Sequence, residues 1–403
     1  MTVQIQKGKA FGRVSAPPSK SMGHRLLICA ALAEGESRIR GISESADMKA
    51  TLGCLTALGV GYALEGDTVT VHGIRMQDAK PQTPLYCNES GSTLRFFIPL
   101  AMLSGNNALF TGAEALFRRP MTVYEELARE KGLFFSKDSQ SAAVRGPLVS
   151  GEYRVAGNVS SQFISGLLFA LPLLSGDSVI RITPPLESRS YIHLTITALA
   201  SFGVKVEWQD ELTLFIRGGQ RYIPTDAVVE GDYSGAAFLD ALTALGGEVE
   251  TEGLNPDSLQ GDRVYHRFFP MLSRGTPTLH LGDCPDLGPI LFAVAAAKNG
   301  AVFTGTERLR MKESDRVAAM ADELAKFGVT VTEGENSVVV YPTDFHAPTE
   351  MLDGHNDHRI VMALSVLATL TGATITGAEA VAKSFPDFFE RLSSLGIAVI
   401  KQG

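Results

Sequence analysis

Cysteine is scarce in this sequence, tryptophan occurs once, and no apolar run is long. The four cysteines, Cys29, Cys54, Cys87 and Cys284, lie far apart without a CxxC pair. This argues against a disulfide framework or a cysteine zinc site. The longest apolar stretches, near 167–174 and 290–297, are shorter than the ~18 residues that span a bilayer, and the N-terminus has no signal-peptide core. We therefore expect a soluble cytoplasmic protein that does not bind a membrane.

Basic residues are also fewer than acidic ones. The sequence has 36 Lys and Arg and 44 Asp and Glu, which gives a net charge of -8. This balance argues against a general attraction to nucleic acid, so any anion-binding site must be a local cluster. The length of 403 residues, at ~150 residues per domain, predicts two or three domains.

One pattern occurs six times along the chain: a residue that can cap a helix, an apolar run, and then a glycine. Ser, Asp and Asn at such starts accept hydrogen bonds from the unpaired amides of a helix N-terminus. Most copies continue with an amphipathic helix that ends at glycine and a β-branched strand, as at 55–60 and 324–329. The pattern predicts six repeated α/β units. Their starts are Ser19, Ser90, Ser160, Asp232, Asp286 and Asn356.

The two ends of the chain complement each other. The sixth copy stops at 399–400 without its last strand, whereas residues 2–5 form a strand pattern that belongs to no copy. We infer that the N-terminus completes copy six. This predicts two lobes of three repeats each, residues 14–225 and residues 1–13 plus 226–403, joined by a double crossover hinge near 13 and 225. Two crossings would restrict motion to opening and closing around a cleft.

Reactive residue types gather at the predicted helix starts. Apolar helices such as 163–174 should be buried on all sides, so only their first turns can meet a ligand. Free amides, helix dipoles and a cluster of cations at those turns predict a site for a ligand with more than one anionic group. The helix starts hold Lys20, Ser21, Arg25, Gly91, Ser160, Ser161, Gln162, Asp286, His358 and Arg359. Loops and second-helix starts add Arg119, Ser188, Lys312, Glu313, Arg316 and Lys383.

Simpler interpretations exist for several of these residues. The two serines Ser160 and Ser161 are typical helix caps. Glu313 and Arg316 have the i, i+3 spacing of a pair on a helix surface. His355 and His358 are spaced like two metal ligands, but no third ligand is evident, so we expect no metal.

Six strings resemble the 5-enolpyruvylshikimate-3-phosphate (EPSP) synthase family of enolpyruvyl transferases, and the resemblance covers nearly the whole chain. They are PSKSMGHR (18–25), ESGSTLR (89–95), VSSQF (159–163), LRMKESDR (309–316), NDHR (356–359) and KSFPD (383–387). The resemblance implies a two-lobed inside-out α/β barrel of six βαβαββ units, three per lobe, with the ligand cleft between the lobes. It also implies transfer of the enolpyruvyl group of phosphoenolpyruvate to the 5-hydroxyl of shikimate 3-phosphate, releasing phosphate without a metal or cofactor.

The resemblance also assigns ligands and roles. Shikimate 3-phosphate is expected to be held by Lys20, Ser21, Arg25, Ser160, Ser161, Gln162, Ser188, Asp286 and Lys312. Phosphoenolpyruvate is expected to be held by Lys20, Gly91, Arg119, Gln162, Arg316, Arg359 and Lys383. The reaction needs an acid, a base and cations for the leaving phosphate. We expect Glu313 to be the acid and Asp286 the base, with Lys20 sharing either proton transfer and His358 orienting the phosphate or a carboxylate.

Two other functions are weighed against this one. UDP-N-acetylglucosamine enolpyruvyl transferase shares the fold and the chemistry but typically uses a cysteine on a mobile loop, and the stretch 112–119 has none. A ring-forming DNA clamp would place basic residues along exposed helix faces, whereas here they cluster at helix starts. We expect a monomer that acts on small molecules.

Overall fold

The computed structural model describes residues 1–343 and 345–402 and divides the chain into two compact units. Unit 1 contains Met1–Ser19 and Gly231–Gly403, and unit 2 contains Lys20–Glu230. The crossings predicted near 13 and 225 therefore lie a few residues later. The first is later because β2 (Phe11–Ser15) pairs in parallel with β15 (Glu248–Glu252). The second is later because β14 (Ala227–Val228) pairs with β3 (Gly35–Arg40).

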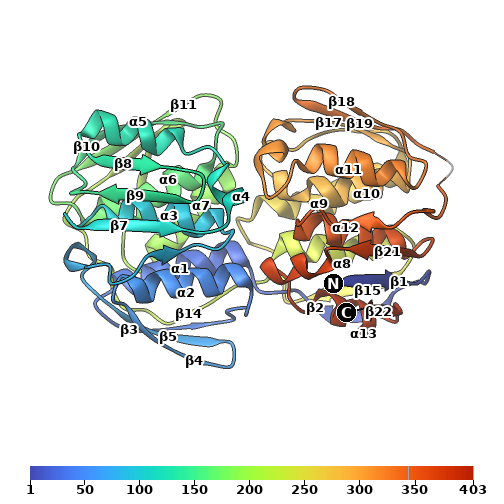
Figure 1. Cartoon of the computed structure of the whole chain (residues 1–403), viewed down its shortest axis with the longest axis horizontal. Coiled ribbons are helices and arrows are strands. Elements are labelled where there is room, and N and C mark those ends of the chain that lie inside the picture. Colours follow the sequence, from blue (N-terminus) through green and yellow to red (C-terminus); the bar gives the residue numbers. More distant parts are fainter. Residues whose placement is uncertain (344, 403) are drawn as a thin grey trace. The chain divides into compact units, whose positions relative to one another are not determined.

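Unit 2 contains three four-stranded sheets, one for each of the first three repeats (Figure 1). In each sheet the first two strands are parallel and the remaining pairings are antiparallel. The first has the order β14-β3-β5 (Thr68–Gly73)-β4 (Gly61–Glu65). The second has the order β6 (Leu85–Tyr86)-β7 (Asn107–Thr111)-β9 (Ser141–Arg145)-β8 (Phe134–Lys137). The third has the order β10 (Gly151–Ala156)-β11 (Ser178–Thr183)-β13 (Thr213–Ile216)-β12 (Glu207–Asp210).

Unit 1 repeats this plan with one reduced sheet, the two-stranded β15-β2. The fifth repeat has the order β16 (Thr278–His280)-β17 (Ala301–Thr304)-β19 (Ser337–Val340)-β18 (Val331–Glu333). The sixth has the order β20 (Leu352–Asp353)-β21 (Ala373–Thr376)-β1 (Thr2–Ile5)-β22 (Val399–Gln402). Strand β1 is antiparallel to both neighbours, so the N-terminal strand completes the sixth copy.

Helices fill the interior of each unit while the sheets lie outside them (Figure 1). In unit 2 the helices are α1 (Lys20–Leu32), α2 (Ala46–Ala57), α3 (Gly91–Ala101), α4 (Glu114–Phe117), α5 (Thr122–Lys131), α6 (Ser161–Ala170) and α7 (Arg189–Ser201), with short 3-10 turns η1 (Met76–Asp78) and η2 (Leu171–Leu173). In unit 1 they are α8 (Tyr233–Ala244), α9 (Tyr265–Arg274), α10 (Gly288–Ala296), α11 (Arg316–Ala325), α12 (His358–Ala368) and α13 (Phe388–Ser394). The 3-10 turns of unit 1 are η3 (Gly261–Val264), η4 (Pro285–Leu287), η5 (Glu307–Met311) and η6 (Ala378–Lys383).

Burial explains this inside-out arrangement. Every residue of α10 and α12 is buried, as expected for helices that are apolar on all sides. Strands β5 and β9 alternate between buried and more exposed residues, which is typical of a sheet with one face on the core and one toward water. The structure confirms the predicted fold class of repeated α/β units, three in each of two lobes.

Side-chain caps begin most of the interior helices. Ser90, Ser160, Asp232 and Asp357 each accept a hydrogen bond from a backbone amide in the first turn of the following helix. Asp286 differs from our prediction, because it lies in η4 and makes no cap for α10. Its carboxylate is turned toward two arginines instead.

Two further features concern the cysteines and the lengths of the helices. All four cysteines are free and buried. Among the described residues, no helix has the length and apolar character that crossing a membrane requires.

Candidate active site

The start of α1 carries two of the predicted cations in different environments. Lys20 Nζ lies 2.8 Å from Asp47 Oδ2, a buried carboxylate in the first turn of α2. This partner offsets the unfavourable placement of a lysine at a helix N-terminus. Arg25, one turn later, is buried and its Nη1 donates to the carbonyl of Ser21 at 2.7 Å. Sequence analysis missed Asp47, which lies 27 residues from Lys20 with no local signal to pair them.

Arg25 also ties α1 to α7. Its Nε donates to Thr195 Oγ1 at 2.8 Å and its Nη2 to the Tyr191 carbonyl at 3.0 Å, while the guanidinium lies over the Phe96 ring. Burial lowers the pKa of Arg25 to about 10, which leaves it a cation at neutral pH. Ser188, which precedes α7, is buried in a left-handed conformation (φ 55°). The starts of α1 and α7 are thereby brought together.

A second set of contacts brings the starts of α3 and α6 together. Arg95 Nη1 donates to Gln162 Oε1 at 2.7 Å, and Gln162 Nε2 donates to Ser92 Oγ at 2.9 Å. A β-carbon added to Gly91 would lie 2.9 Å from Arg119 Nη1 and 3.5 Å from Gln162 Oε1. Gly91 therefore leaves open a small space between a guanidinium and an amide. Arg95, which we did not assign to the site, fixes the orientation of the Gln162 amide.

In unit 1, Arg316 is the centre of an ion-pair cluster. It begins α11, its side chain is 1% exposed, and it contacts three carboxylates. Its Nη1 lies 2.9 Å from Asp286 Oδ1, its Nη2 2.6 Å from Glu313 Oε2, and its Nε 2.8 Å from Asp357 Oδ2. Burial lowers the pKa of Arg316, but the three carboxylates outweigh it and the net shift is upward. Arg316 is thus buried and Glu313 is partly buried, so the two do not form the surface pair of the simpler interpretation.

Asp286 connects this cluster to two further cations. Its Oδ2 accepts from Arg359 Nη2 at 3.1 Å, and its Oδ1 lies 3.4 Å from Lys312 Nζ. Burial, assisted by neighbouring arginines, lowers the pKa of Lys312 to about 8, although Asp286 opposes the shift. A lysine with this pKa can bind an anion as a cation or exchange a proton near neutral pH.

The start of α12 and the end of η6 complete the group in unit 1. His358 is buried, and its Nδ1 lies 3.9 Å from Asp357 Oδ1. Arg359 Nη2 lies 3.3 Å from Ser234 Oγ at the start of α8. Lys383 Nζ donates to the Asn356 carbonyl at 2.5 Å. No group of three possible metal ligands occurs among the residues that the structure describes.

The sixteen predicted site residues divide between the two units. Unit 2 holds Lys20, Ser21, Arg25, Gly91, Arg119, Ser160, Ser161, Gln162 and Ser188. Unit 1 holds Asp286, Lys312, Glu313, Arg316, His358, Arg359 and Lys383. Asp357 was part of the NDHR string, but only its contact with Arg316 reveals it as the third carboxylate of the cluster. The roles of the sixteen residues stay predictions.

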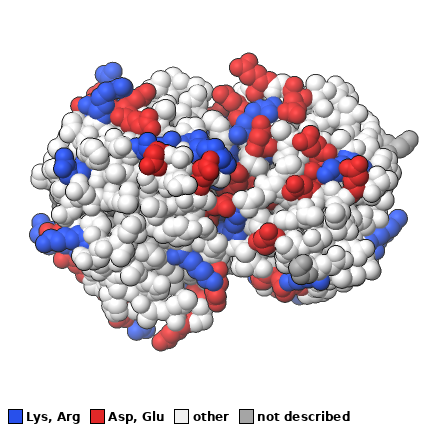
Figure 2. Space-filling model, viewed as in Figure 1, with Lys and Arg blue, Asp and Glu red and all other residues white. Residues whose placement is uncertain are grey.

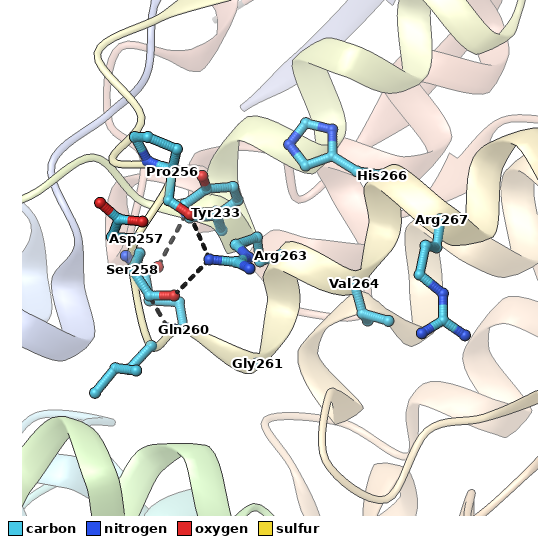
Figure 3. Close-up of a pocket in the computed structure, with 11 residues that line it drawn as sticks. Tyr233, Pro256, Asp257, Ser258, Gln260, Gly261, Arg263, Val264, His266 and Arg267 are labelled. Atoms are coloured by element: carbon cyan, nitrogen blue, oxygen red, sulfur yellow. Dashed lines mark hydrogen bonds between the residues drawn. The ribbon is translucent and has the colours of Figure 1, made fainter.

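A separate cavity of about 780 Å³ lies in unit 1 beside the starts of η3 and α9 (Figure 3). Arg263 Nη1 donates to the Pro256 and Ser258 carbonyls there and holds the preceding loop. None of the sixteen predicted residues lines this cavity. The ion-pair cluster around Arg316 is therefore the stronger candidate for chemistry.

Carboxylates held against buried cations at the starts of apolar helices are typical of an enzyme site for small anionic substrates. Comparison with known proteins gives the family. The sequence model of EPSP synthase (3-phosphoshikimate 1-carboxyvinyltransferase) matches residues 5–392, so this chain belongs to the EPSP synthase family and is a transferase. The resemblance seen in the six strings is confirmed.

Individual relatives agree along the whole chain. The 3-phosphoshikimate 1-carboxyvinyltransferase of Clostridium kluyveri is 40% identical, over 98% of this chain and 97% of its own. That of Clostridium acetobutylicum is 39% identical, over 96% and 95%. The solved EPSP synthase from Acinetobacter baumannii is 25% identical with a TM-score of 0.79, covering 99% and 100%. The enolpyruvyl transferase NikO from Streptomyces tendae, 16% identical with a TM-score of 0.79 over 99% and 98%, shares the fold.

Proposed function

We propose that this chain transfers the enolpyruvyl group of phosphoenolpyruvate to the 5-hydroxyl of shikimate 3-phosphate and releases phosphate, as a step of the shikimate pathway to aromatic amino acids. The observation that carries the proposal is the buried guanidinium of Arg316 surrounded by Asp286, Glu313 and Asp357. It places candidate acid and base groups beside cations that can hold anions. The family membership supports the same reaction.

The two substrates carry four anionic groups, one carboxylate and one phosphate each. We assign shikimate 3-phosphate to Lys20, Ser21, Arg25, Ser160, Ser161, Gln162, Ser188, Asp286 and Lys312. We assign phosphoenolpyruvate to Lys20, Gly91, Arg119, Gln162, Arg316, Arg359 and Lys383. The contacts of Gln162 with Arg95 and Ser92 fix which end of its amide faces each neighbour.

The proposed chemistry is addition followed by elimination. In the addition, Glu313 gives a proton to the methylene carbon of phosphoenolpyruvate while Asp286 takes the proton of the 5-hydroxyl, whose oxygen bonds to the central carbon. In the elimination, the Glu313 carboxylate takes a proton back from the new methyl group and phosphate departs with the proton that Asp286 held, which restores the carbon-carbon double bond and both side chains. Lys20 shares in either proton transfer, and His358 orients the phosphate or a neighbouring carboxylate. The surrounding cations stabilise the departing phosphate.

The pairing of Glu313 with Arg316 suggests how an acid is produced near neutral pH. In the described contacts the guanidinium satisfies three carboxylates. A substrate carboxylate that binds Arg316 would replace Glu313 as its partner. Glu313 would then lose this cationic partner, which favours its protonated form.

The alternative substrate is UDP-N-acetylglucosamine. The comparisons favour the shikimate substrate, and the segment 112–119, which contains α4, has no cysteine. The deciding experiment mixes purified protein with phosphoenolpyruvate and either acceptor and measures phosphate release. Release that depends on shikimate 3-phosphate supports the proposal, and release with UDP-N-acetylglucosamine replaces it.

The remaining expectations concern partners and location. We propose a cytoplasmic monomer that uses no metal or organic cofactor. Four free, buried thiols support a reducing compartment. On the face of each unit shown in Figure 2, lysines and arginines lie among acidic residues, whereas a DNA clamp needs a continuous basic track.

A further inference from the structure

The turn between β20 and α12 has an unusual backbone. His355 (φ 48°) and Asn356 (φ 51°) are consecutive non-glycine residues in the left-handed region. This conformation is disfavoured for residues with a β-carbon and persists where surrounding contacts impose it. The turn leads directly into Asp357, the N-cap of α12 and a partner of Arg316. The contacts of the turn therefore decide where these groups lie.

Glu323, which lies in α11 two turns after Arg316, contacts this turn. Its side chain is 2% exposed. Its Oε2 accepts from the Asp353 amide at 2.9 Å, and its Oε1 accepts from His355 Nε2 at 3.0 Å. Asp353 Oδ1 in turn accepts from the His355 amide at 2.8 Å. Lys326 Nζ, 2.9 Å from Glu323 Oε2, offsets the buried charge.

The pKa shifts of Glu323 and His355 favour the same hydrogen bonds. Burial raises the pKa of Glu323, but its hydrogen bonds with His355, Lys326 and Asp353 outweigh burial, so the net shift is downward. The hydrogen bond with Glu323 raises the pKa of His355, against the effect of burial. An ionised carboxylate only accepts hydrogen bonds, so Nε2 of His355 is the donor in either protonation state of the ring.

At its other end the turn reaches Lys383. The Asn356 carbonyl accepts from Lys383 Nζ at 2.5 Å, and the Asp357 amide donates to the Gly354 carbonyl at 2.8 Å. We propose that Glu323 is a positioning residue, which fixes the turn so that the Asn356 carbonyl orients the Lys383 ammonium. The inference rests on the proposed function, in which Lys383 binds phosphoenolpyruvate.

The test compares KM with kcat in matched variants. In Glu323→Gln one oxygen is replaced by an N–H group, which cannot accept from the Asp353 amide, from His355 Nε2 as donor or from Lys326 Nζ, so the turn loses a contact. We expect the KM for phosphoenolpyruvate to rise about tenfold, the order of effect for losing one hydrogen bond to a charged group. The KM for shikimate 3-phosphate and kcat should change little. His355→Ala should act in the same direction, and His355→Gln, which keeps an N–H donor, should restore most of the loss.

Asp240→Asn is the matched control. This carboxylate of α8 accepts from Thr251 Oγ1 at 2.6 Å and Tyr265 Oη at 2.5 Å in the same unit, and its described contacts do not reach the turn. It should lower the melting temperature without changing the KM for phosphoenolpyruvate. An unchanged KM in Glu323→Gln, or an equal rise in Asp240→Asn, overturns the inference.

A crystal structure of Glu323→Gln separates this inference from the proposed function. We expect the Lys383 Nζ to Asn356 carbonyl contact to be lost or lengthened. An unaltered contact overturns the positioning role whatever the enzyme catalyses. Wild-type protein that releases no phosphate from the two substrates contradicts the proposed function alone, because the crystallographic comparison still decides whether Glu323 positions Lys383.

Discussion

Glu313 Oε2 accepts a hydrogen bond at 2.6 Å from Nη2 of Arg316, which lies three residues later in the sequence. The proposed proton donor is therefore ion-paired with a proposed ligand of phosphoenolpyruvate. Arg316 in turn contacts Asp286, the proposed base. One buried guanidinium thus links substrate binding to the charge state of both proton-transfer groups, and substitutions there separate binding from turnover.

Glu313→Gln removes the proton donor while preserving the size of the side chain. We expect kcat to fall by about 10²- to 10⁴-fold, the usual contribution of a general acid. The Kd for shikimate 3-phosphate, measured by isothermal titration calorimetry, should stay within about threefold. Turnover near the wild-type rate would remove Glu313 from the mechanism.

Lys312 predicts a pH dependence of substrate binding. Its pKa is lowered to about 8, mainly by burial. The cationic form, which attracts the phosphate, dominates below this pH and is lost above it. The KM for shikimate 3-phosphate should therefore be flat below pH 8 and rise as the pH increases beyond it. Lys312→Arg, whose guanidinium stays charged, should remove the rise, and a profile that stays flat in the wild type would contradict the prediction.

Much of the fold follows from local sequence. Helix caps such as Ser90 and Ser160, apolar helices and glycine stops are local signals, and they predicted six copies and most of the helix starts. The place of the N-terminal strand between β21 and β22 could be predicted, because the sixth copy lacked one strand of the repeated pattern. The reduced sheet β15-β2 did not follow, because its two strands come from distant parts of the chain and no local signal pairs them.

Long-range pairings in the site were beyond prediction. Arg316 meets Asp357 across 41 residues, and Glu323 reaches His355 across 32. Charge and spacing along the chain do not reveal which acid meets which base. Asp286 shows the same limit, since a residue placed as a helix cap serves in the structure as an ion-pair partner of Arg316 and Arg359.

Gly91→Ala tests the space beside Arg119. The added β-carbon would lie 2.9 Å from Arg119 Nη1, too close for an ordinary contact, so the guanidinium must shift by a few tenths of an ångström. We expect the KM for phosphoenolpyruvate to rise about tenfold through this displacement.

Gly53→Ala is the control, because a β-carbon there meets nothing within 4 Å. It should leave KM unchanged and stabilise α2 by about 1 kcal/mol, seen in urea unfolding. A KM that Gly91→Ala leaves unaltered would show that Arg119 does not hold this substrate.

Thr195→Val tests whether the anchoring of Arg25 matters for the other substrate. The Thr195 hydroxyl accepts from Arg25 Nε at 2.8 Å, donates to the Tyr191 carbonyl at 3.1 Å and contacts Ser165 Oγ at 2.7 Å. Valine has nearly the same shape but cannot accept, so the guanidinium loses a buried partner.

We expect the KM for shikimate 3-phosphate to rise about tenfold, in line with a lost hydrogen bond to a charged group. The KM for phosphoenolpyruvate should change less than about twofold, because Arg25 is assigned to one substrate only. Ser165→Ala removes the other hydroxyl partner of Thr195 and leaves the contact with Arg25 in place. A similar KM rise in both variants would mean that the helix packing between α6 and α7, and not the orientation of Arg25, controls binding.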